Sequence, residues 1–181
     1  MALIQKNLTE QQVELINNVE TCDLLFTKES SWINKIISWK TKSPFGHVAF
    51  IYRITDSRLG VKIPIVIEAI RKGVIIKPLA LYMKDFRGEI YVTRHVDVDE
   101  EKRVEMVEKA LSYIGLKYDF DQLFSIFINK GVDNDNKLIC SELVDLIYSA
   151  AGIELIRDHG CATPASIIRD QNLVFVGSCV V

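Results

Sequence analysis

The sequence predicts a single α+β domain over residues 1–181, in which a helical part packs on a small antiparallel β-sheet or barrel. Two observations lead to this class. Between residues 23 and 95 the apolar residues fall in short, strand-length runs separated by turn residues. From residue 97 onward they recur mainly at three- and four-residue steps, which is the period of a helix. A chain of 181 residues can bury a hydrophobic core without disulfides or metals to support it.

The expected strands lie mostly in the first half of the chain. They cover residues 23–27 (DLLFT), 47–54 (HVAFIYRI), 64–70 (PIVIEAI), 74–79, 88–95 (GEIYVTRH) and, near the C-terminus, 173–176. Because turn-forming residues separate the consecutive runs, we expect the first half of the chain to form a β-meander.

Helices are expected where a capping residue precedes a helical apolar pattern. Thr9 with Gln12 forms a capping-box pair for a helix that ends at about Val19. Further helices are expected from residue 30 or 31 to 41, from 97 or 99 to 115, over 120–128, over 137–152, and after the pair at 163–164. In the helix ending at 41, Trp32 and Trp39 lie on one side, as core residues or as the wall of a groove.

Composition excludes several classes of protein. The formal net charge is -2 and no block of like charge occurs, which argues against a nucleic-acid-binding protein. The four cysteines are widely spaced, so neither a disulfide framework, a metal site nor another cofactor is expected. The chain shows no signal peptide and no apolar run near ~18 residues, so we expect a cytoplasmic protein without stable membrane insertion.

Cys140 is the main candidate for a catalytic residue. It lies at the start of the predicted helix 137–152, where unpaired backbone N–H groups and the positive end of the helix dipole favour an anion. Such a position lowers the pKa of a thiol, and the thiolate is the nucleophilic form. The alternative is a buried cysteine that packs as a small apolar residue.

A nucleophilic thiol needs a base, and three histidines are available. His47 opens an otherwise apolar strand directly after a glycine, which suits a residue poised at a sheet edge. His95 is expected to be a solvated strand end. His159 has only Cys161 near it in sequence, which is weak evidence for a metal site.

Glu68 is the candidate group to orient that base, because it is a carboxylate within an apolar strand. If the hairpin is centred between Ser57 and Arg58, position 47 falls opposite position 68 and the two side chains share a face. A slip of one residue would place them on opposite faces, and Glu68 would then be a half-exposed residue of an edge strand.

Residues 110–157, with ALSYIGLKYDF followed by LICSELVDLIYSAAGIELIR, resemble the nucleophile region of NlpC-type cysteine peptidases. Those are papain-like enzymes that act on bacterial cell-wall peptides, and their histidine follows the cysteine in sequence. Here the histidine and the glutamate precede it. That order is similar to the circularly permuted YiiX/YebB-like branch, and DLLF at 23–26, GHVAF at 46–50 and IEA at 67–69 match its motifs. The resemblance spans residues 22–157, with Cys22 where the family usually has glycine.

The resemblance implies a permuted papain-like fold with Cys140 as nucleophile, His47 as base and Glu68 as the third catalytic residue. Tyr118 and Ser141 are expected to contribute to the substrate or oxyanion site. The implied function is thiol-dependent hydrolysis at an amide carbonyl of a small substrate, a cell-wall-type peptide or an amino-acid amide.

Two other functions remain open at the level of the sequence. One is a lipid-directed acyltransferase or phospholipase of the same permuted class, in which the apolar residues 120–128 would contact lipid rather than core. The other is a catalytically silent module that binds peptide in the cleft.

Overall fold

The computed structural model describes residues 8–29, 43–58, 60–70, 73–115, 138–157 and 162–181. Several sequence-based expectations fall outside these residues. They are the helix ending at 41 with its two tryptophans, the helix over 120–128, Tyr118, and the His159–Cys161 pair.

Within the described part of the chain, the strands form one six-stranded sheet. They are β1 (Leu24–Glu29), β2 (His47–Asp56), β3 (Val61–Ile70), β4 (Gly73–Pro78), β5 (Gly88–His95) and β6 (Leu173–Val180). Their order in the sheet is β4-β3-β2-β1-β5-β6, and each neighbouring pair is antiparallel. The predicted strands are therefore confirmed, with β6 extending further than expected.

The predicted meander is correct for β2, β3 and β4 but wrong for the strands on either side. β1 lies between β2 and β5, so β5 pairs with β1 and not with β4. The reason is the burial of β1, where Leu24, Leu25 and Phe26 are all fully buried. Consecutive side chains of a strand point to opposite faces, so this run requires cover on both faces and neighbours on both edges.

A helix that the sequence analysis did not predict connects β4 to β5. It is α4 (Leu79–Asp85), so Leu79 begins a helix instead of ending a strand. Its buried residues Leu79, Tyr82 and Met83 follow the helical period, but seven residues carry too little of that period to distinguish a helix from a strand. No capping side chain marks its start, because Pro78 occupies that position.

The predicted caps of three other helices are confirmed, and the cap at residue 30 or 31 lies outside the described residues. Thr9 and Gln12 form the capping box of α2 (Glu10–Asn18), Asp99 rather than Asp97 caps α5 (Glu100–Ser112), and Thr163 caps α8 (Pro164–Ile167). The helix of the candidate nucleophile is α7 (Leu138–Ala150). In the described residues, no helix is long and apolar enough to cross a membrane.

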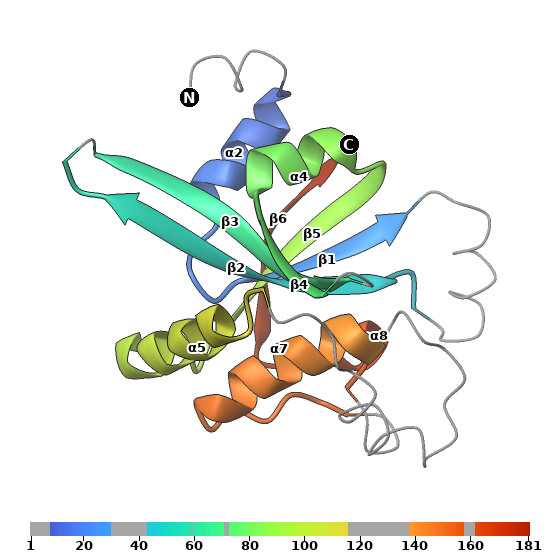
Figure 1. Cartoon of the computed structure of the whole chain (residues 1–181). Helices are drawn as coiled ribbons and strands as arrows, with labels where there is room; N and C mark the ends of the chain where they lie inside the picture. The colour runs from blue at the N-terminus through green and yellow to red at the C-terminus, as the bar shows by residue number, and fades with distance from the viewer. Residues whose placement is uncertain (1–7, 30–42, 59, 71–72, 116–137, 158–161) are drawn as a thin grey trace.

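The sheet is the middle layer between two sets of helices (Figure 1). Helices α2 and α4 cover one face through a cluster that includes Leu15, Leu79 and Met83. Helices α5, α7 and α8 cover the other face through a larger cluster that includes Met106, Val144 and Ile167. Cys140 belongs to this larger cluster, so the candidate nucleophile lies between α7 and the sheet.

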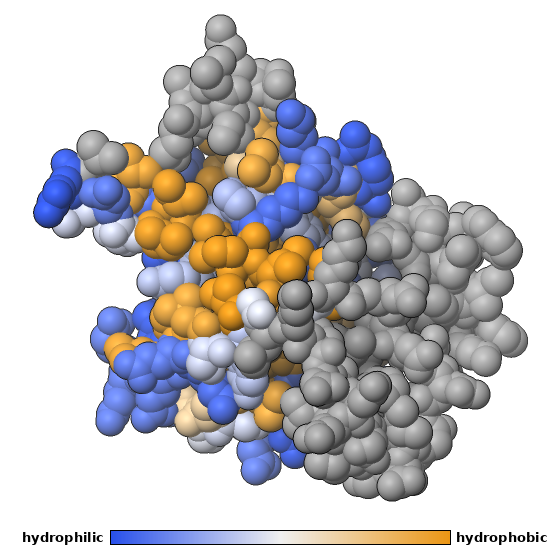
Figure 2. All heavy atoms as spheres, viewed as in Figure 1, coloured by the Kyte–Doolittle hydropathy of each residue, from blue (hydrophilic) through white to orange (hydrophobic). Residues whose placement is uncertain are grey.

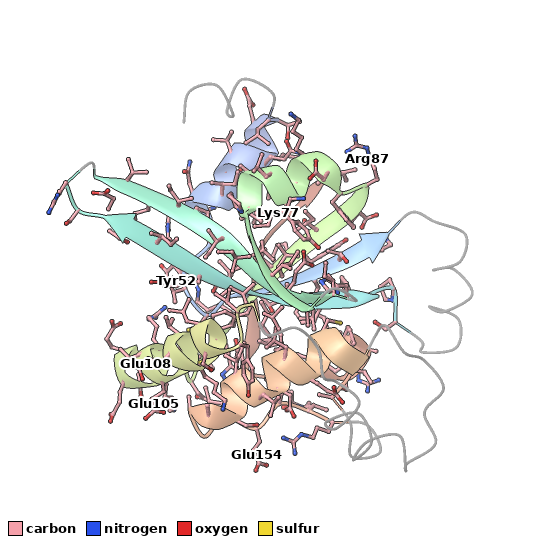
Figure 3. The ribbon with its side chains drawn as sticks, in the orientation of Figure 1. Tyr52, Lys77, Arg87, Glu105, Glu108 and Glu154 are labelled. Carbon is pink, nitrogen blue, oxygen red and sulfur yellow. The ribbon has the colours of Figure 1, made fainter. Side chains whose placement is uncertain are left out.

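The hairpin of β2 and β3 projects beyond the covering helices (Figure 1). Ile54 and Ile63 are direct cross-strand partners near its tip and are 42% and 38% exposed. Figure 2 shows apolar side chains along this hairpin and across the middle of the molecule. On α5, by contrast, Glu105 and Glu108 point away from the sheet (Figure 3) and are exposed.

The expectation that His95 is a solvated strand end is wrong. His95 is only 2% exposed because the fully buried Tyr148 of α7 packs against it, with ring centroids 5.8 Å apart. Its Nδ1 accepts a hydrogen bond from the backbone N–H of Asp97. Burial lowers the pKa of His95 more than the charges of Asp170 and Asp97 raise it. His95 is therefore a core histidine in this fold.

Asp23, the residue before β1, accepts a group of hydrogen bonds that we call the Asp23 tie. Its side chain is fully buried, and its two carboxylate oxygens accept from Arg94 Nε at 2.7 Å and Nη2 at 2.9 Å. Asp23 Oδ2 also accepts from the backbone N–H of Glu20 at 2.7 Å. Arg94 in turn donates to the carbonyl of Asn18 at the end of α2. One carboxylate thus joins α2, β1 and β5.

We expect Asp23→Ala to lower the free energy of unfolding by about 2–3 kcal/mol, because it removes two hydrogen bonds of Arg94 and leaves the Glu20 N–H without its acceptor. Chemical denaturation monitored by circular dichroism would measure this change. Asp85→Ala is the control, because its ion pair with Lys77 lies on the surface and should leave the midpoint close to wild type. Equal midpoints for wild type and Asp23→Ala would contradict the role of this tie.

Candidate active site

Cys140 occupies the third position of α7, which confirms the predicted placement at a helix N-terminus. Its side chain is fully buried, and its sulfur accepts from the backbone N–H groups of Val48 and Ser141. Unpaired N–H groups in the first turn of a helix stabilise negative charge nearby. The first turn of α7 and the start of β2 therefore surround the thiol with backbone donors.

His47 and Glu68 lie on neighbouring strands and touch each other. His47 is the first residue of β2, and its Nε2 lies 2.8 Å from Oε2 of Glu68 on β3. The Glu68 side chain is 9% exposed and that of His47 is 20% exposed. This contact provides the partner that a carboxylate needs when it is buried within an apolar strand.

The predicted hairpin register was wrong by two residues. Phe50 faces Ile67, whereas the predicted register would have placed it opposite Ile65. Because the side-chain pattern of a strand has a period of two, a shift of two leaves positions 47 and 68 on the same face. Glu68 then reaches His47 along the diagonal of the ladder, which is within range of two long side chains.

His47 also forms a hydrogen bond with Cys140. Nε2 of the ring is engaged by Glu68, so Nδ1 is the nitrogen that remains for the thiol. The structure therefore brings the three predicted residues Cys140, His47 and Glu68 together in one chain of contacts, with the imidazole in the middle.

Electrostatics in this cluster favour the charged forms of the thiol and the imidazole. Burial raises the pKa of Cys140, but the charge of His47 and hydrogen bonds from His47, Val48 and Ser141 outweigh it and lower the pKa from 9.0. Burial opposes the charged imidazolium, yet the thiolate and Glu68 raise the pKa of His47 to about 10. Both shifts favour a thiolate–imidazolium pair over a neutral thiol and a neutral imidazole.

Ser141 is placed differently from the other predicted site residues. Its hydroxyl is fully buried and donates to the carbonyl of Ala162 at 2.8 Å, just ahead of α8. Its backbone N–H is the group that faces the thiol of Cys140. Tyr118, the other residue predicted for the substrate or oxyanion site, lies outside the described residues.

The structure adds Val48 to the site, which the sequence analysis did not identify. Its contribution is a backbone N–H at the thiol, and its side chain is an ordinary buried residue of β2. Only the neighbouring His47 could have drawn attention to it, because backbone donors leave no signature in side-chain patterns.

A buried thiolate beside an imidazolium, with the imidazolium held by a carboxylate, can attack an electrophilic carbonyl and transfer protons. Among the residues that the structure describes, no group of three or more His, Cys, Asp or Glu side chains is placed to hold a metal ion.

Comparisons with known proteins show a family and a shared fold. The model of a family described as permuted papain-like amidase enzymes, YaeF/YiiX, C92 family, matches residues 18–159. Among solved structures, the crystal structure of metalloprotein yiiX from Escherichia coli O157:H7 is similar, with a TM-score of 0.64 and 20% sequence identity. The match covers 91% of this chain and 99% of that chain, and it shows a shared fold. A search of the curated proteins found no match.

We expect iodoacetamide near pH 6 to label Cys140 before Cys22 and Cys179. All three thiols are buried, so accessibility does not separate them. Burial raises the pKa of Cys22 to about 12 and that of Cys179 to about 11, whereas the pKa of Cys140 is lowered. Peptide mass mapping after limited labelling would identify the modified residue.

The role of His47 in this reactivity can be tested in the same assay. His47→Ala should slow labelling of Cys140 at pH 6 by about tenfold or more, because each unit of pKa changes the thiolate fraction tenfold. His95→Gln is the matched control, because that histidine contacts Tyr148 and belongs to the core. Labelling of Cys22 or Cys179 ahead of Cys140 would contradict the electrostatic account.

Proposed function

Because this chain belongs to the permuted papain-like amidase family, YaeF/YiiX, C92, we propose that it hydrolyses amide bonds of small peptides through a Cys140–His47–Glu68 triad. Membership in this family makes it a cysteine hydrolase of the peptidase and amidase type. The roles of the three residues and the nature of the substrate are our proposal.

The single observation that supports the triad best is the position of His47 between two partners. Its ring bonds Glu68 on one side and Cys140 on the other. A base with these two contacts can accept a proton from the thiol while its tautomer and orientation stay fixed.

In the proposed acylation step, the Cys140 thiolate attacks the amide carbonyl and forms the S–C bond. The carbonyl oxygen takes up the electron pair as an oxyanion, and the backbone N–H groups in the first turn of α7 stabilise it. His47 then donates its proton to the amide nitrogen, the C–N bond breaks, and the amine leaves a thioester on Cys140.

Deacylation returns the enzyme to its starting state. His47, now neutral, removes a proton from water as the water attacks the thioester carbonyl. The S–C bond breaks, the carboxylic acid product departs, and the thiolate–imidazolium pair forms again. Glu68 acts throughout by holding the imidazole and favouring its charged form.

We propose a cell-wall-type peptide or an amino-acid amide as the substrate. The support is the resemblance of residues 110–157 to the nucleophile region of NlpC-type peptidases, together with the amidase family match. An assay that compares hydrolysis of wall-peptide fragments with hydrolysis of phospholipid vesicles would distinguish this substrate from the lipid-directed alternative.

A silent binding module is the less favoured function. A cysteine that served only for packing would be neutral in an apolar setting, whereas the pKa of Cys140 is lowered against the effect of its burial. Turnover of amino-acid coumarin amides, absent in Cys140→Ala, would separate an enzyme from a module that only binds.

We expect His47→Ala to reduce kcat/KM on such a reporter by about 10²- to 10⁴-fold, the usual contribution of general acid–base catalysis. Glu68→Gln should cause a smaller loss, because an amide still accepts a hydrogen bond but does not stabilise the imidazolium by charge. Glu105→Gln, on the exposed face of α5, is the control and should match wild type.

The pH profile provides a second readout for Glu68. In wild type the ion pair forms as pH rises through the lowered pKa of Cys140 and is lost as pH rises through about 10, the pKa of His47. Without the carboxylate the imidazolium is less stable, so the alkaline limb of Glu68→Gln should move to lower pH. A profile of Glu68→Gln identical to wild type would remove Glu68 from the triad, and an active His47→Ala would remove the mechanism.

A further inference from the structure

A row of aromatic rings lies on the face of the sheet that also holds Cys140. Phe26 contacts Phe45 with ring centroids 5.6 Å apart, Phe45 contacts Tyr91 at 5.1 Å, and Tyr91 contacts Phe175 at 6.5 Å. We call Phe45, Tyr91 and Phe175 the aromatic shelf, with Phe26 fully buried beneath it. Aromatic pairs at these separations stabilise one another and form an ordered apolar surface.

The aromatic shelf begins beside the catalytic cluster. Phe45 is two residues before His47, and the intervening Gly46 donates its N–H to the carbonyl of Thr27 on β1. Phe26 pairs with Val48 on one side and with Tyr91 on the other. Since the Val48 N–H faces the thiol of Cys140, the row from Val48 through Phe26 to Tyr91 leads from the nucleophile across the sheet.

Exposure increases along the row of rings from Phe26 to Phe175. Phe26 is fully buried, Phe45 and Tyr91 are half-buried, and Phe175 on the edge strand β6 is 64% exposed. A single exposed phenylalanine needs no explanation. A row of edge-on and tilted rings that continues from the buried cluster of Cys140 to the surface offers apolar area to a molecule bound at the nucleophile.

The rim of the shelf carries charges that neutralise each other. The Tyr91 hydroxyl donates to Glu89 Oε2 at 2.8 Å, and Lys28 Nζ lies 3.0 Å from Glu89 Oε1. These contacts hold the Tyr91 ring in place and leave no unpaired charge in this trio. The aromatic shelf therefore favours an apolar group over a charged one.

We propose that the aromatic shelf binds the apolar or aromatic side chain of the substrate residue next to the scissile amide. This inference rests on the proposed function, because it assigns a substrate preference to the same site. A side chain suits the shelf better than a long lipid chain does. Three rings offer a short platform, and a long chain would also have to cover the Lys28–Glu89 pair.

The test measures alkylation of Cys140 by two chloromethyl ketones, N-acetyl-phenylalanine and N-acetyl-glycine chloromethyl ketone. In both, the thiolate displaces chloride and forms a C–S bond to the methylene carbon, so only the side chain differs. We expect wild type to react about fivefold or more faster with the phenylalanine reagent, through tighter binding before the chemical step.

Phe175→Ala should reduce this preference to about twofold or less, while its rate with iodoacetamide stays at the wild-type value. Val174→Ala is the matched control. Val174 is the adjacent residue of β6, is 46% exposed, and points to the opposite face of the sheet, so this variant should keep the wild-type preference.

The outcomes separate the two proposals. A Phe175→Ala protein that alkylates normally and keeps the full preference would overturn the aromatic shelf and leave the triad intact. No alkylation of Cys140 by any of the reagents would instead overturn the proposed function. A dimer that becomes monomeric in Phe175→Ala, measured by light scattering, would assign the shelf to self-association and overturn its role in substrate binding.

Discussion

The interaction on which this structure depends is the buried pair formed by Cys140 and His47. A thiol without any solvent exposure would ordinarily be neutral and inert, because burial raises its pKa. Here the imidazolium and two backbone N–H groups reverse that effect. The pair is stable only if both partners are held, because a buried charge whose partner moves away is strongly destabilising. The rest of the fold can be understood as the means of holding them.

The sheet holds His47 through backbone pairing and through Glu68. The backbone of His47 pairs with Thr27 of β1, and Glu68 is fixed by pairing with Ile75 of β4. Both strands lie inside the sheet and not at its edges. The histidine is therefore positioned by elements with neighbours on both sides, which are more rigid than loops and suit a group that must meet a thiol at hydrogen-bond distance.

Local signals in the sequence were sufficient for the strands, for the capped helices and for the candidate residues, but not for the short helix α4. Thr9, Asp99 and Thr163 marked helix starts, and the position of Cys140 at a helix N-terminus followed from periodicity. Features that depend on contacts between residues far apart in the sequence could not be predicted from local signals. The burial of His95 depends on Tyr148 of a distant helix, and the central place of β1 depends on cover from both faces. The predicted register of β2 and β3 differs from the observed register by two residues. Positions 47 and 68 still lie on the same face, because the side chains of a strand alternate between faces with a period of two residues.

The order of the candidate catalytic residues along the chain matters little, because contacts near both ends of α7 fix it to the segments that precede α8 and β1. Near its start the Ser141 hydroxyl bonds the carbonyl of Ala162, and near its end the Tyr148 hydroxyl bonds the carbonyl of Cys22 at 2.8 Å. Cys22 has a φ of +74°, a conformation that side-chain-bearing residues rarely adopt and glycine adopts freely. The Cys22 side chain is buried in the same cluster as Cys140. Since these contacts tie α7 to segments that are far apart in the sequence, the candidate nucleophile is held beside a candidate base that precedes it in the chain.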